Sequence, residues 1–113
     1  MFDAMFYQAV LPDRVKAECE NCPSEVPVVE LHLGSGAVLD LCHILHASGE
    51  WMVCRFFRNP GHDDEMDVAF VPYGLVSLVT VSTHPPEKRR FGFQLESSVA
   101  PRPEDPPAPT EVR

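Results

Sequence analysis

The amino-acid sequence predicts a mainly β fold: a small five-stranded barrel with a short N-terminal helix and a disordered proline-rich C-terminal tail. Three observations predict it. Residues 26–82 contain most of the valine, leucine and phenylalanine of the chain. Within that stretch, short runs alternate apolar and polar residues with a period of two, which is typical of strands. Residues that favour turns, mainly glycine, serine and proline, separate the runs.

Length and charge restrict the function classes. The chain has 113 residues, enough for one domain with a small core. Its 17 acidic and 9 basic residues give a net charge of −8. Nucleic-acid affinity depends mainly on lysine and arginine contacts to phosphates, so this balance argues against nucleic acid and favours neutral or basic partners.

Residues 1–25 are expected to form an N-terminal helical segment. Its apolar residues recur at spacings of three and four, as on one helix face: Phe2, Met5, Phe6 and Ala9. Asp3 is a candidate N-cap, Pro12 is expected to end this helix, and residues 13–22 form a second short helical candidate. The apolar face predicts that the segment docks on the sheet or on a neighbouring subunit.

Residues 26–83 form the predicted barrel. Its strands are expected at residues 28–33, 37–46, 51–57, 66–73 and 75–82. Residues 34–36 make a glycine-containing hairpin turn, and Gly74 makes a tight corner. The second strand is apolar on both faces, so we expect it to bend. The single tryptophan, Trp51, is expected to be largely buried.

Residues 84–113 are expected to be a largely disordered tail. From residue 97 onward proline, glutamate, alanine and aspartate dominate, and such a composition buries too little apolar surface to offset its ordering entropy. Before that point lies a basic cluster, Lys88, Arg89 and Arg90, followed by Phe91 and Phe93, which could add one contact to the domain.

The pattern of strands resembles a known family. Residues 29–36 read as the first hairpin and residues 69–79 as the last two strands of an Sm-like (LSm or Hfq-type) domain, or of another small SH3-like barrel. The resemblance covers about half of the chain. In the Sm-like family the fourth and fifth strands carry the subunit contacts of a ring, and nearby loops bind RNA.

The chain departs from that family where RNA would bind. Sm-like proteins have an aspartate and a small polar residue after the second strand, and a basic or glycine-containing motif between the fourth and fifth. Here residues 47–50 and 72–74 occupy those places, and no lysine or arginine lies between Phe70 and Pro86. The comparison implies that the usual RNA pocket is absent.

Cys19 and Cys22 form a C-x-x-C, a spacing that can supply half of a tetrahedral zinc site. A second pair of ligands is needed. Cys42 and His43 are adjacent on a predicted strand, so their side chains should point to opposite faces. Cys54 lies on another strand. We expect no metal and no other cofactor, and read the two thiols as incidental.

No catalytic motif is present: no nucleophile has a base and an orienting acid at a readable spacing, and no glycine-rich phosphate loop follows a strand. The chain is therefore not expected to be an enzyme. It contains no secretory signal and no apolar run of about 20 residues, so we expect a cytoplasmic protein with no membrane segment.

The apolar residues of the last two predicted strands indicate a function. A small barrel leaves strand edges, and unprotected edges associate. The residues that could form such an interface are apolar and cluster around the corner: Phe70, Val71, Tyr73, Leu75 and Val76. We predict a non-enzymatic homo-oligomeric or protein-interaction module. The alternatives are RNA binding, with Lys88, Arg89 and Arg90 as contacts, and a metal- or thiol-dependent protein using Cys19 and Cys22.

Overall fold

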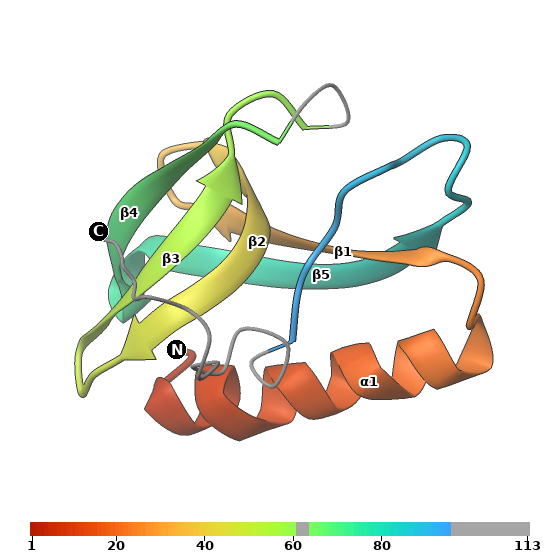
Figure 1. Cartoon of the computed structure of the whole chain (residues 1–113). Helices are drawn as coiled ribbons and strands as arrows, with labels where there is room; N and C mark the ends of the chain where they lie inside the picture. The colour runs from red at the N-terminus through yellow and green to blue at the C-terminus, as the bar shows by residue number, and fades with distance from the viewer. Residues whose placement is uncertain (61–63, 96–113) are drawn as a thin grey trace, which may run out of the picture.

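The computed structural model describes residues 1–60 and 64–95, and it has the predicted mainly β architecture (Figure 1). One helical segment precedes a single antiparallel sheet of five strands. The strands are β1 (Val26–Leu33), β2 (Val38–Ala47), β3 (Trp51–Phe57), β4 (Met66–Pro72) and β5 (Val76–His84). A 3₁₀ turn, η2 (Tyr73–Leu75), makes the expected tight corner between β4 and β5. The expected strands differ from these bounds by at most two residues at either end.

The helical segment is continuous, which corrects the prediction that Pro12 separates two short helices. A π-helical turn, η1 (Phe6–Val10), leads directly into α1 (Leu11–Asn21). Within η1, the backbone N–H of Leu11 donates to the carbonyl of Phe6, five residues back. This wider turn accommodates Pro12 in the first turn of α1, where a missing N–H costs least. Asp3 caps the segment as expected, since its Oδ1 accepts the N–H of Phe6 at 2.9 Å.

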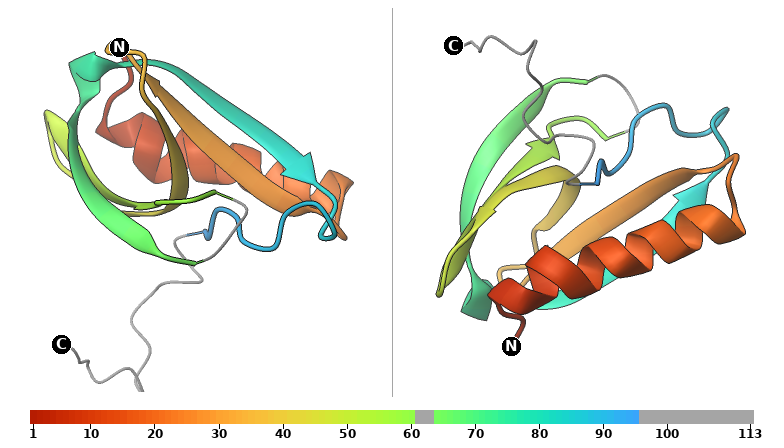
Figure 2. Two further views of the ribbon diagram at one scale, coloured as in Figure 1. Left: turned by 90° about the horizontal axis from the view of Figure 1, so that it is seen from above. Right: turned by 60° about the horizontal axis from the view of Figure 1, so that its bottom comes forward.

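The order of strands in the sheet is β4-β3-β2-β1-β5. In the part of the chain that the structure describes, each of β4 and β5 therefore has a strand neighbour on one side only, and no ladder joins them into a closed ring. The sheet is strongly curved, and the helical segment lies along its open lower side (Figures 1 and 2). The register of β2 on β3 shifts after Leu41 and again after Ile44. These two irregularities bend β2, as its two apolar faces led us to expect.

The core lies between the helical segment and the concave face of the sheet. From the helix come Tyr7, Leu11 and Val15, all buried. From the sheet come buried side chains of every strand: Val29, Leu31, Leu41, Met52, Cys54, Val71 and Val76. The predicted docking of the N-terminal segment on the sheet is therefore confirmed.

The folded domain extends past its expected end at residue 83. Phe93 is 6% exposed and belongs to the core, and Leu95 packs against it. Residues 84–95 are thus part of the domain, and the possible contact of Phe91 and Phe93 is a substantial one. The remainder of the predicted tail, residues 96–113, lies outside the described residues.

Candidate interaction surface

Within residues 1–60 and 64–95, β4 pairs with a strand on one side only, so its other edge is free and presents backbone hydrogen-bonding groups. The N–H of Tyr73 donates to the carbonyl of Glu50 at 3.1 Å, just beyond the last β3–β4 pair, Trp51 with Pro72. In an antiparallel ladder the residues that bond to the neighbour alternate with residues whose N–H and C=O point away from it. Counting back from Tyr73, the groups of Val68 and Phe70 point away from β3, toward the open edge.

Three rings lie side by side on the outer face next to this edge: His46 on β2, Trp51 on β3 and Phe70 on β4. We call them the outer aromatic cluster. The centroid of the Trp51 ring lies 6.0 Å from that of Phe70 and 6.1 Å from that of His46. Phe70 is 71% exposed and Trp51 is 41% exposed. Val68, also on β4, is exposed as well.

The position of Trp51 corrects the expectation that it is buried. Side chains alternate along β3, and it is the next residue, Met52, that is fully buried. Trp51 begins the strand on the opposite, outer face. An exposed tryptophan beside an exposed phenylalanine at a sheet edge is the type of surface on which protein interfaces are centred.

The five predicted interface residues divide into two groups. Phe70 and Leu75 are exposed, whereas Val71, Tyr73 and Val76 are buried in the core of the single chain. Tyr73 stacks on Tyr7 with ring centroids 5.3 Å apart. Its hydroxyl donates to the carbonyl of Ser48 at 2.5 Å. Side-chain contacts to a partner at this corner are therefore available to Phe70 and Leu75, while the other three side chains hold the corner in place.

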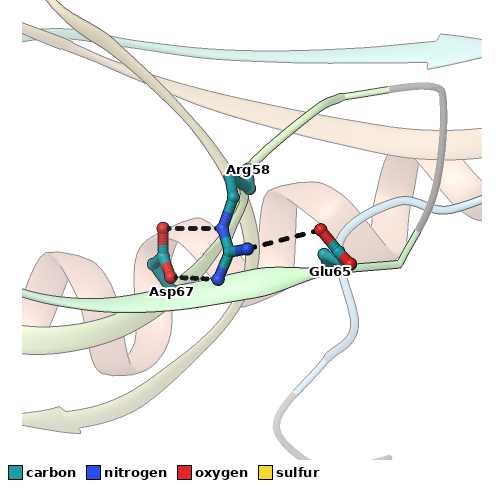
Figure 3. A network of polar contacts seen from close by, with 3 residues as sticks. All are labelled: Arg58, Glu65 and Asp67. Carbon is teal, nitrogen blue, oxygen red and sulfur yellow. Dashed lines mark hydrogen bonds and ion pairs between the residues drawn. The ribbon is translucent and has the colours of Figure 1, made fainter.

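Arg58 fixes the end of the β3–β4 hairpin that leads to this edge (Figure 3). Its Nη2 and Nε donate to the two carboxylate oxygens of Asp67 at 2.8 and 3.2 Å, and its Nη1 donates to Glu65 at 3.3 Å. The hydrogen bonds from Arg58 lower the pKa of the Asp67 carboxyl. The planar guanidinium thus joins the start of β4 to the end of β3, and the exposed stretch that follows begins at Val68.

The basic cluster does not form one exposed patch. Lys88 and Arg90 are exposed, but Arg89 forms an ion pair with Asp40 on β2, and both side chains are nearly buried. The Nε of Arg89 also donates to the carbonyl of Phe91 at 2.7 Å, and the guanidinium lies 5.8 Å from the Phe57 ring centroid. Of the three predicted nucleic-acid contacts, Arg89 is therefore not available on the surface, because its side chain is paired with Asp40 inside the domain.

The thiols show no arrangement for metal binding within residues 1–60 and 64–95. Cys19 and Cys22 are free and half-buried, and Cys22 is the C-cap of α1. Burial, followed by the acidic neighbours Glu18 and Glu20, raises the pKa of Cys19, which disfavours the thiolate that a metal needs. No group of three histidine, cysteine or acidic side chains that could hold a metal ion occurs in this part of the chain.

Cys42 and His43 lie closer together than their alternation on a strand predicted. The Nδ1 of His43 is 3.2 Å from the Sγ of Cys42, because the register shift in β2 falls between Leu41 and His43. An extra residue in a strand places neighbouring side chains on one side. Burial raises the pKa of Cys42 and, with the nearby charge of Arg55, lowers the pKa of His43, so both groups are held neutral.

Comparison with protein-family models, with curated protein sequences and with solved structures finds no match to this chain. Among the described residues, no helix has both the length and the apolar character needed to cross a membrane.

Proposed function

We propose that this protein is a non-enzymatic interaction module that assembles with further copies of itself by strand addition at β4. The observation that carries the proposal is the free edge at Val68 and Phe70, where outward-pointing backbone groups adjoin a side chain that is 71% exposed. An unpaired edge of this kind is a template for another strand.

The outer aromatic cluster would supply most of the side-chain energy of such a contact. Aromatic residues are the commonest hot spots at interfaces, and partly exposed rings gain the most when a partner excludes water. Many natural proteins protect an exposed edge with lysine, proline or an inward-pointing charge. Pro72 and the Arg58–Asp67 pair lie at the two ends of β4. Between them the exposed side chains of Val68 and Phe70 are apolar, so the middle of β4 has no such protection.

Two assemblies are compatible with edge addition. The resemblance to Sm-like proteins favours a ring, in which β4 of one copy pairs with β5 of the next. A two-fold dimer would instead pair β4 with β4. The two differ in whether the exposed Leu78 on β5 takes part. Four free thiols fit a reducing compartment, and we place the module in the cytoplasm.

Multi-angle light scattering at micromolar concentration tests the proposal. We expect the natural chain to be a dimer or a ring, and Phe70→Lys to be a folded monomer because a lysine on the edge opposes strand addition. Val38→Lys is the matched control, since Val38 is also an exposed apolar residue on the sheet but lies on β2, away from the edge. Leu78→Lys should dissociate a ring and leave a β4–β4 dimer intact. A natural chain that is monomeric at these concentrations would reject the proposal.

Salt separates self-association from the RNA-binding alternative. Two copies with a charge of −8 each repel one another, so added salt should strengthen self-association. RNA binding would rest on Lys88 and Arg90, since Arg89 is paired with Asp40, and added salt would weaken it. We expect no electrophoretic shift of single-stranded RNA at low salt. Elemental analysis tests the alternative at Cys19 and Cys22, and we expect metal-free folded protein.

A further inference from the structure

The sheet divides where β1 and β2 diverge. These strands pair over Val29–His32 and Val38–Leu41, and the pairing stops there. On either side the other ladders continue: β1 stays paired with β5 back to Val26, and β2 stays paired with β3 as far as Ala47. Pro27 has no N–H to give to a neighbour, and the irregularity after Leu41 bends β2 away. An opening therefore separates the first residues of β1 from the second half of β2.

The chain's own residues 89–95 fill this opening. The backbone N–H of Phe93 donates to the carbonyl of Pro27 on β1 at 2.8 Å, and that of Gln94 donates to the carbonyl of Cys42 on β2 at 2.6 Å. The segment thus bonds to both separated strands and lies between them in two views (Figures 1 and 2, right). Its side chain Phe93 enters the core.

The fit of this segment is specific at two positions. A Cβ on Gly92 would stand 2.1 Å from the carbonyl oxygen of Pro27 and 2.5 Å from Cγ1 of Val26, so the backbone can lie this close to β1 only if the residue is glycine. Arg89 enters a nearly buried ion pair with Asp40 and lies over Phe57. The opening therefore selects an arginine, a glycine three residues after it, and an aromatic residue directly after the glycine.

Two hollows border the segment. A cavity of about 130 Å³ borders it on the side of Tyr7 and His46, with Phe93 and Gln94 in its wall. A groove of about 410 Å³ borders its other side, between Val26 and Phe91. Among the described residues, Phe93 and Gln94 bond to two different strands instead of extending one ladder, and hollows lie on both flanks, as is typical of a bound peptide.

We propose that the opening between β1 and β2 is a binding site for an extended Arg-x-Phe-Gly-Phe-x peptide, occupied here by residues 89–94 of the same chain and able to take this segment from a second copy. The segment joins β5 through residues 85–88, a turn in which the carbonyl of Pro85 accepts the N–H groups of Lys88 and Arg89 at 2.9 and 3.1 Å. Opening that turn would release the segment without breaking a strand of the sheet. Exchange of segments would then link two copies at a site separate from the β4 edge.

Full-length Gly92→Val tests the proposal, because the added side chain excludes the chain's own segment from the opening. A fluorescent peptide of residues 86–95 should bind this variant, measured by anisotropy, at least about tenfold more tightly than it binds the natural chain, in which the site is occupied. The same peptide with valine for glycine, or with glutamine for the arginine that pairs with Asp40, should bind at least about tenfold more weakly than the natural peptide.

Equal binding of the natural and valine peptides, or no binding to folded Gly92→Val, would overturn the proposal. If this variant is unfolded alone, the natural peptide should restore its cooperative thermal transition, and failure to do so also overturns it. Phe70→Lys combined with Gly92→Val should bind the peptide as Gly92→Val does, so the outcome is independent of association at β4.

Discussion

The buried ion pair between Arg89 and Asp40 gives the most quantitative prediction. Their side chains are 10% and 5% exposed, and they join residues that lie 49 apart in the sequence. Arg89→Met keeps an unbranched apolar stem but removes the guanidinium and its charge. The Asp40 carboxylate would then be buried without its partner, and removing one member of a buried pair costs about 3–5 kcal/mol.

Urea denaturation followed by circular dichroism measures this loss. For a domain of this size, a loss of about 3 kcal/mol lowers the melting temperature by at least about 12 °C. The control is the double variant Asp40→Leu with Arg89→Met, which replaces both charges by apolar groups. We expect it to regain most of the stability, because a buried pair is often worth no more than a well-packed apolar one.

A loss below about 1 kcal/mol in Arg89→Met would refute this reasoning, since exposed ion pairs contribute only that much. With Asp40→Leu measured alone, a loss in the double variant equal to the sum of the two single losses would refute it as well, because it would mean that the two side chains do not interact.

Three further predictions follow from burial. Met52→Ala should lower the unfolding free energy by about 2–5 kcal/mol, because the Met52 side chain is fully buried. The neighbouring Trp51→Ala should lower it clearly less but should weaken self-association. Equal losses by urea denaturation would contradict the assignment of the two side chains to opposite faces. Burial raises the pKa of the Cys54 thiol to about 12, so above about pH 9 the folded chain keeps a proton that the unfolded chain loses. The unfolding free energy should therefore fall as pH rises above about 9, and it should fall less steeply in Cys54→Ala. An identical pH dependence in the two proteins would show that Cys54 is not its cause. Deletion of residues 98–113, whose composition predicts disorder, should leave the melting temperature nearly unchanged. Truncation after residue 84 removes the buried Phe93 and should lower it markedly, and equal melting temperatures for the two shortened chains would show that residues 85–97 do not stabilise the domain.

Local signals in the sequence were sufficient to predict the strands. Alternation of apolar residues and the glycine turn at residues 34–36 placed the first hairpin, since both act between near neighbours. The bend in β2 could also be predicted, because a strand that is apolar on both sides has to present different parts to the core. The role of Pro12 could not, because a π-helical turn depends on how the whole segment packs.

The features missed by sequence reasoning depend on contacts between distant residues. Trp51 was expected to be buried from the predicted fold alone. In the structure Met52 faces the core, so alternation along β3 places the side chain of Trp51 on the outer face. Arg89 looked like part of a basic surface cluster, since nothing local identifies Asp40 as its partner. Gly92 has a sequence signal only in retrospect: a glycine between two phenylalanines marks a close backbone approach.

Self-association through β4 is tested most directly by measuring the molar mass of the protein in solution. Light scattering on the natural chain and on Phe70→Lys, at one protein concentration and moderate salt, should give a multiple of the 12.6 kDa chain mass for the first and a single chain for the second. Equal masses for the two proteins, whether monomeric or assembled, would show that the exposed edge at Phe70 is not where copies of this protein meet.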